Sequence, residues 1–218
     1  MTAFRTTALA LALSLLSGVT AVLAQAAYEA PLRTQLASMA AAQHPDAMNA
    51  LVPSFERIAA ANPDAWLPNY YAAHFNLMQH WMSGEDGCAP CLEKTDAFLA
   101  KAEAADNNSE VLTLRASYYQ GMLQLHPMRA PYYGPKAGNL LEAAAEKDPS
   151  NPRAASLLGQ NLYYTPSMFG GGADKAKPHV ARAVELFDAE AADAGRSDLL
   201  PSWGADRARG MHEKLAAN

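Results

Sequence analysis

Residues 137–164, AGNLLEAAAEKDPSNPRAASLLGQNLYY, decide the fold. Leu141 and Ala144 lie about one helical turn apart and form part of an apolar stripe along one helix. The Asp148–Pro149 pair ends that helix, because proline has no N–H and cannot lie inside a helical turn. The segment that follows has a small residue at its middle, Gly159, where a second helix can approach closely. The stretch therefore predicts two antiparallel helices joined by a short turn.

Two earlier segments repeat this pattern, at residues 55–63 and 95–108. Each ends at asparagine or proline, and a segment with small residues at its middle follows. These small positions are 44 and then 42 residues apart, whereas a bare helix pair of this kind needs about 34 residues. Each unit therefore carries an insertion of roughly eight to ten residues. The three small positions are Ala73, Ser117 and Gly159.

With these units, the chain resembles the tetratricopeptide-repeat family in a degenerate form with long loops. The resemblance covers about residues 45–190 and is clearest in residues 137–164. There the family's pattern of a small, a large and a small residue followed by proline is matched by Ala137, Leu141, Ala144 and Pro149. The tryptophan that the family places in the first helix is missing, and the insertions break the strict period. The resemblance implies an α–α superhelix with a concave binding surface, and it implies nothing about catalysis.

Composition also favours an all-α fold of antiparallel helix pairs stacked as a short superhelix. Alanine is abundant, and no stretch of alternating Val, Ile and Thr is long enough to build a sheet. The last helix has a largely polar surface, which is typical of the capping helix of a repeat array, and we expect Trp203 to plug the end of the core. The predicted helices span residues 29–42, 46–61, 64–82, 91–105, 109–125, 135–147, 151–163, 174–191 and 203–216.

Residues 1–24 are predicted to be a cleavable signal peptide. Arg5 precedes an apolar run shorter than the roughly 20 residues of a bilayer span, and small residues follow it. We expect cleavage after Ala24 or Ala26, which would leave a TPR-like helical domain over residues 25–218. The sequence therefore predicts a periplasmic or secreted protein without a membrane span.

The net charge of the chain is −5, and it becomes −6 when Arg5 is removed with the signal peptide. Nucleic acid or an anionic membrane as the main partner would require a basic face. This mild acidity therefore argues against both.

Cys88 and Cys91 are the two cysteines of the sequence. In an oxidising compartment we expect them to form a disulfide. The alternative is a thiol-active or copper-handling protein, because a Cys-x-x-Cys pair at a helix start can lower a thiol pKa, and His74 with Met78 offers copper ligands. Covalent haem attachment would need a histidine at position 92, where Leu92 stands. We predict no metal site, no cofactor and no catalytic residues.

Residues 163–175, YYTPSMFGGGADK, combine three glycines with a lysine. A nucleotide-binding loop would follow a strand and would place Lys-Ser or Lys-Thr directly after the last glycine. Here Lys175 comes three residues after that glycine, and the preceding segment is predicted to be helical. The glycines therefore indicate a sharp joint between two helices.

A ligand site at this joint is our sharper hypothesis. Free N–H groups at the start of the helix that follows, with a lysine beside them, could hold a carboxylate or a phosphate. Repeated Tyr-Tyr pairs could line a groove, although such tyrosines also serve as ordinary packing between helices. The predicted ligand-binding residues are Tyr132, Tyr133, Tyr163, Tyr164, Phe169, Gly171, Gly172 and Lys175.

Taken together, these patterns predict a non-enzymatic binding or scaffold protein. Its concave groove would hold a peptide, a partner protein or a small acidic ligand.

Overall fold

The computed structural model describes residues 27–42 and 44–217. This part of the chain contains α-helices, two short 3-10 helices and no strand, which confirms the all-α prediction. The predicted signal peptide and its cleavage site lie outside the described residues. The helices are residues 27–41, α2 (Pro45–Ala61), α3 (Trp66–Met82), α4 (Ala89–Ala105), α5 (Ser109–Leu125), α6 (Ala130–Lys147), α7 (Pro152–Tyr164), α8 (Ala173–Ala192) and α9 (Ala205–Ala216), with η1 (Pro127–Arg129) and η2 (Ser167–Phe169) between them.

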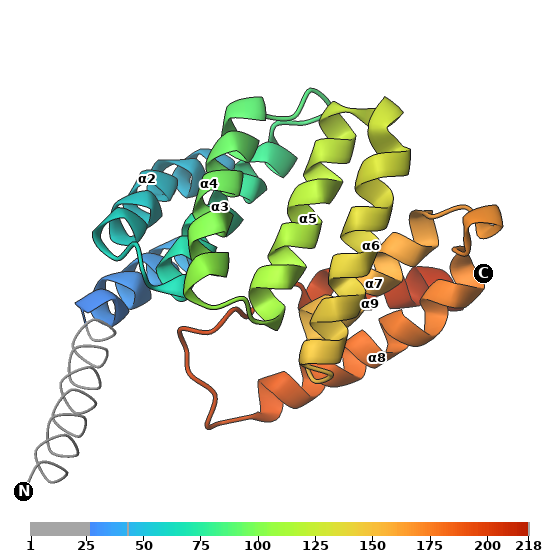
Figure 1. The fold of residues 1–218 in the computed structure, drawn as a ribbon. Helices are drawn as coiled ribbons and strands as arrows, with labels where there is room; N and C mark the ends of the chain where they lie inside the picture. Colours follow the sequence, from blue (N-terminus) through green and yellow to red (C-terminus); the bar gives the residue numbers. More distant parts are fainter. Residues whose placement is uncertain (1–26, 43, 218) are drawn as a thin grey trace, which may run out of the picture.

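The helices from α3 onward pack as successive antiparallel neighbours, α3 with α4, α5 with α6 and α7 with α8 (Figure 1). Because the direction alternates, the α3–α4, α5–α6 and α7–α8 connections lie along one edge of the stack. The α4–α5 and α6–α7 turns lie at the opposite edge (Figure 1). The prediction of stacked helix pairs is confirmed.

An asparagine in the turn begins the second helix of two units. The side chain of Asn108 accepts a hydrogen bond from the Val111 N–H at 3.1 Å. The side chain of Asn151 accepts from the N–H groups of Arg153 and Ala154, at 2.9 and 3.2 Å. These bonds satisfy backbone donors that have no partner inside the helix. The two turns therefore supply the side chains that start α5 and α7, two or three residues after α4 and α6 have ended at Asp106 and Asp148.

The small residue at the middle of α7 allows a close helix approach, as the sequence predicts. A Cβ atom on Gly159 would lie 2.5 Å from the Val180 Cγ2 atom and 3.1 Å from the Val180 backbone nitrogen. Real Cβ atoms essentially never approach another atom within 3.0 Å, and a contact of 3.1 Å is already tighter than most. Helices α7 and α8 can therefore pack at this distance because position 159 has no side chain.

Gly159→Ala should lower the free energy of unfolding by about 1–3 kcal/mol, because the added methyl group overpacks the contact with Val180. The matched control is Gly210→Ala in α9, where nothing lies within 4 Å of the added Cβ. That change should raise stability by about 0.5–1 kcal/mol, because glycine is the poorer helix former. Urea denaturation measures both. Equal stabilisation by the two substitutions would contradict the close approach.

The segment between α8 and α9, residues 193–204, returns along the stack to α3 (Figure 1); we call it the crossing segment. The Tyr71 hydroxyl donates to the Leu199 carbonyl at 2.8 Å, and the Trp203 indole N–H donates to the Tyr70 hydroxyl at 2.8 Å. The Trp203 ring stacks on His74 with 5.0 Å between the ring centroids. Trp203 thus packs against α3 and the neighbouring α5 and α7, and not at the end of the core as predicted.

One predicted helix boundary is wrong. The sequence predicts a helix from residue 135, whereas α6 begins at Ala130. Pro131 already occupies the first turn, where a missing N–H has no effect, and Pro135 is accommodated inside the helix. In the described part of the chain, no helix is both long and apolar enough to cross a bilayer.

Candidate functional site

Four tyrosines from two neighbouring helices line a surface cleft. Tyr118 and Tyr119 lie just past the middle of α5, and Tyr132 and Tyr133 lie in the first turn of α6. The ring centroids are 5.3 Å apart in the first pair and 5.1 Å apart in the second. Tyr119 and Tyr133 stack across the two helices at 5.9 Å. The cleft encloses about 480 Å³, within the range of about 300–1,000 Å³ that small-molecule sites occupy.

The cleft also contains two cations. The Lys136 ammonium lies 4.4 Å from the centroid of the Tyr132 ring and 5.3 Å from that of Tyr119. Arg129 lines the cleft from the start of α6 and is exposed. Among the residues that the structure describes, neither cation has a carboxylate partner, and the one carboxylate in the lining, Asp96, is paired with Arg115. An anion in the cleft would therefore meet two available positive charges.

The inner wall of the cleft is neutral at ordinary pH. Burial raises the pKa of Tyr118 to about 12, with a further rise from the charge of Asp96, so its hydroxyl keeps its proton. The Arg115 guanidinium lies 5.2 Å from the centroid of the Tyr118 ring and is held by Glu103 at 2.6 Å and by Asp96. Tyr132 at the rim is 55% exposed, whereas Tyr133 is buried. The site therefore has an inner wall held by the Arg115 ion pairs and an exposed aromatic edge.

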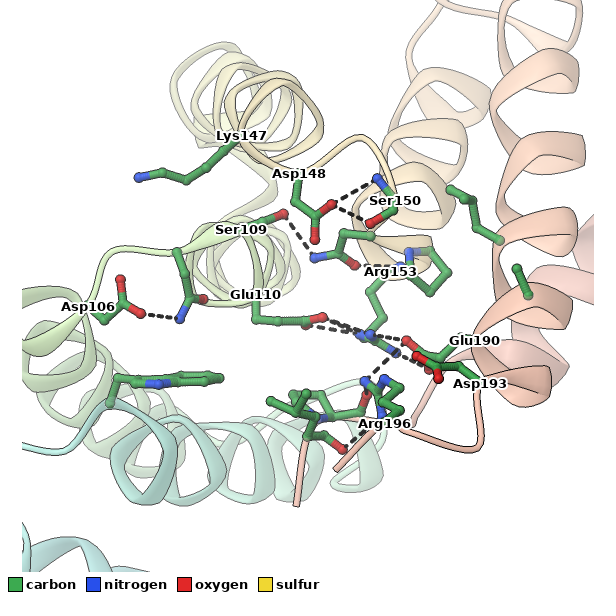
Figure 2. Close-up of a pocket in the computed structure, with 18 residues that line it drawn as sticks. Asp106, Ser109, Glu110, Lys147, Asp148, Ser150, Arg153, Glu190, Asp193 and Arg196 are labelled. Atoms are coloured by element: carbon green, nitrogen blue, oxygen red, sulfur yellow. Dashed lines mark hydrogen bonds and ion pairs between the residues drawn. The ribbon is translucent and has the colours of Figure 1, made fainter. Parts of the chain in front are cut away.

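A second cavity, of about 570 Å³, lies between α5, α7, α8 and the crossing segment (Figure 2). Arg153, whose side chain is 2% exposed, lies at its centre. Its guanidinium donates to Glu110 at 2.8 and 2.9 Å and to Glu190 at 2.9 and 2.6 Å (Figure 2). Arg196 of the crossing segment approaches Glu190 at 3.2 Å.

This network continues into the aromatic core. The Tyr70 hydroxyl donates to Glu110 at 3.4 Å and accepts from the Trp203 indole. Burial raises the pKa of Glu110, although the charge of Arg153 opposes the rise. Burial alone would lower the pKa of Arg153, but Glu190 and Glu110 raise it above its usual value, so the guanidinium stays charged. The Tyr70 hydroxyl, which accepts from the indole, links this ion-pair network to Trp203. We interpret the ion pairs around this cavity as structural: they hold the crossing segment against α5, α7 and α8.

The lining of that cavity is acidic, with five carboxylates against three cations. An anionic ligand would therefore be repelled there and attracted in the tyrosine cleft. The carboxylates are Asp106, Glu110, Asp148, Glu190 and Asp193, and the cations are Lys147, Arg153 and Arg196.

The three glycines form a joint, as the sequence predicts. The Gly172 N–H donates to the Leu162 carbonyl at 2.8 Å, which closes the end of α7. A Cβ on Gly171 would lie 2.1 Å from the Thr165 carbonyl oxygen, so that position admits glycine alone. Gly172 has a φ of 108°, which other residues rarely adopt.

The predicted ligand residues separate into two groups. Tyr132 and Tyr133 lie in the tyrosine cleft, together with Tyr118 and Tyr119. Tyr163 and Tyr164 pair at 5.0 Å at the end of α7, and Tyr163 has the Lys214 ammonium 4.8 Å from its ring. Phe169 and Lys175 are exposed near the joint. Tyr70 and Tyr71, a further pair in the sequence, are buried in the core and line no groove.

Sequence reasoning missed Arg129 and Lys136 as partners of the tyrosines. Tyr132 and Lys136 lie four residues apart and so share one face of a helix. This signal is lost when the helix is predicted to begin at residue 135, after Tyr132.

Cys88 and Cys91 form the predicted disulfide at the start of α4. The Cys88 N–H donates to the Nδ1 atom of the buried His80 at 2.9 Å, which joins this turn to α3. Burial lowers the pKa of His80, so the ring accepts this bond in its neutral form.

The copper alternative finds no support in these contacts. Both sulfurs are used in the disulfide, and the His74 ring is stacked between Tyr70 and Trp203. Over residues 27–42 and 44–217, no group of three or more His, Cys, Asp or Glu side chains could hold a metal ion.

Replacing both cysteines by serine should lower the free energy of unfolding by about 2 kcal/mol or less, because the disulfide closes a loop of only a few residues. Guanidinium denaturation of the double variant and of the reduced protein measures this. A loss much larger than that, or a change in ligand binding, would show that the pair is more than a local link.

Comparison with solved structures finds the HusA haemophore from Porphyromonas gingivalis, with a TM-score of 0.74 and 30% sequence identity. The match covers 87% of this chain and 93% of that chain. This chain belongs to the family of HusA. The similarity to HusA agrees with a helical-repeat architecture, whereas the tetratricopeptide assignment stays a prediction. No protein-family model and no curated protein sequence matches the chain.

Proposed function

We propose that this protein is a non-enzymatic binding protein that carries haem or a related porphyrin in the tyrosine cleft. The observation that carries the proposal is the gathering of four tyrosine rings beside two cations that have no carboxylate partner within residues 27–42 and 44–217. The name of HusA, a haemophore, describes a haem carrier, and this chain shares its fold over most of both chains. The predicted signal peptide supports a role in the periplasm or outside the cell.

The chemistry of the lining fits such a ligand. A porphyrin is a flat aromatic ring, which stacks on tyrosine, and its two carboxylates suit an arginine and a lysine at the mouth of the cleft. Phenol and thioether groups, which Tyr118, Tyr119 and Met122 supply here, are among the groups that contact haem iron in proteins. The sequence-based hypothesis of a small acidic ligand is retained in this form.

Tyr132→Ala should weaken haem binding by about tenfold, because it removes an aromatic wall of the cleft. The matched variant is Tyr164→Ala, which removes another exposed tyrosine of a Tyr-Tyr pair, beside the glycine joint. Absorbance titration with haem measures both dissociation constants. If only Tyr164→Ala weakens binding, the ligand site lies at the glycine joint, as the sequence predicts, and not in the tyrosine cleft.

The same haem titration also tests the two cations of the cleft, Arg129 and Lys136. Arg129→Gln with Lys136→Gln should weaken binding by about two- to fivefold and should reduce its salt dependence. A haem affinity that none of these changes alters would exclude the cleft as the site.

A further inference from the structure

The exposed large apolar side chains of the described chain lie along one edge of the stack. They occupy the α3–α4, α5–α6 and α7–α8 connections, which alternate with the turns of the opposite edge (Figure 1). The α5–α6 and α7–α8 connections contribute most of them, and we call this set the apolar rim. It consists of Met128, Tyr132, Tyr164, Met168 and Phe169.

The rim side chains protrude and do not line a hollow. Met128 is 92% exposed, Met168 83% and Phe169 72%. None of these three lines the tyrosine cleft or the cavity of Figure 2. A stable water-exposed surface rarely keeps several such side chains together without a binding role. These separate, protruding side chains can all enter the acyl region of a lipid bilayer. A protein partner would need a separate pocket for each of them.

Charge is distributed unequally between the two edges. Residues 126–136 and 164–177, which carry the rim, contain four lysines and arginines and one acid. That acid, Asp174, lies 3.9 Å from Lys177. The turns and segment ends at the opposite edge carry mostly acids, among them Asp64, Asp106, Asp148 and Asp193. The chain is acidic overall, but the α5–α6 and α7–α8 part of this edge is basic. The net charge alone therefore does not exclude an anionic membrane as a partner of this part.

We propose that the apolar rim docks on an anionic phospholipid surface. Aromatic and methionine side chains would enter the interface between headgroups and acyl chains, while Arg129, Lys136, Lys175 and Lys177 face the phosphates. The neighbouring α3–α4 connection also exposes Trp81, but Glu85 and Asp86 lie beside it, so the α5–α8 part of the edge carries the contact.

The proposal does not depend on what the cleft holds. Tyr132 belongs both to the rim and to the cleft, so docking would place the mouth of the cleft at the lipid surface. An apolar ligand could then pass between the bilayer and the cleft without crossing water.

Flotation of the purified protein with lipid vesicles tests this proposal. We expect binding to vesicles of phosphatidylcholine mixed with phosphatidylglycerol, and much weaker binding to phosphatidylcholine alone or at high salt. The triple variant Met128→Ser, Met168→Ser, Phe169→Ser should lose about tenfold or more of the partition coefficient, because binding scales with buried apolar area. Circular dichroism confirms that this variant is folded.

The cations have a matched control at the opposite edge. Lys175→Gln with Lys177→Gln should lower the partition coefficient by about fivefold or more, because each cation near a lipid surface contributes to attraction. Lys101→Gln with Lys147→Gln, near the far ends of α4 and α6, should leave it unchanged. Equal binding by wild type and the triple serine variant, or no binding to anionic vesicles, would overturn the proposal. In the second case the rim would be assigned to a protein partner.

Discussion

Arg153→Met should lower the free energy of unfolding by about 3–5 kcal/mol, the largest effect expected of any single substitution here. The side chain of Arg153 is 2% exposed, and the side chains of Glu110 and Glu190 are each 15% exposed. Removing the guanidinium leaves two poorly solvated carboxylates: Glu190 keeps a cationic partner, Arg196, whereas Glu110 keeps only the long hydrogen bond from Tyr70. The crossing segment should loosen as well, because it is then attached to this network only through the ion pair between Arg196 and Glu190.

Urea denaturation measures the effect, and two further variants separate its causes. Glu110→Gln added to Arg153→Met should recover part of the loss, because it removes one of the unpaired charges. Arg209→Met, which breaks the exposed pair with Asp188, should change stability by no more than about 1 kcal/mol. A loss of similar size for Arg153 and Arg209 would contradict the role of the buried network.

Acid should destabilise the protein through His74. Burial, with a smaller effect of the Arg153 charge, lowers the pKa of His74 to about 3 in the folded chain, whereas its usual pKa is 6.5. Between these two values the unfolded chain binds a proton that the folded chain does not. Stability should therefore fall as the pH decreases from about 6.5 towards 3, by about 1.4 kcal/mol per pH unit from this residue.

His74→Phe should make stability less dependent on pH over this interval, because phenylalanine can stack on Trp203 and binds no proton. The raised pKa of Glu110 acts in the opposite direction, since that carboxyl group binds its proton more readily when folded. The informative quantity is therefore the difference in slope between the wild type and the variant, from urea denaturation at several pH values. Identical slopes would show that His74 is protonated in the folded protein.

The helices were predictable because their ends are encoded locally. Pairs such as Asn62–Pro63 and Asp148–Pro149 stop a helix whatever surrounds them, and small residues such as Gly159 mark where helices meet. The start of α6 was misjudged for the same reason, since Pro135 is a local stop signal that the tertiary structure overrides.

The site could be predicted only in part, because it depends on contacts between helices. The sequence contains several Tyr-Tyr pairs that look alike, yet Tyr70 and Tyr71 are core residues whereas Tyr132 and Tyr133 face a cleft. Which pair meets which depends on how the helices are stacked. Arg153 likewise reads as an ordinary surface cation, and only the approach of Glu110 and Glu190 from other helices makes it a buried one.

The central claim is that the tyrosine cleft holds a porphyrin, and a nuclear magnetic resonance titration of the labelled protein with zinc protoporphyrin tests it most directly. The account predicts saturable shifts of the backbone signals around residues 118–136, at the end of α5 and the start of α6. Absence of binding, or shifts confined to the glycine joint or to the cavity around Arg153, would contradict it.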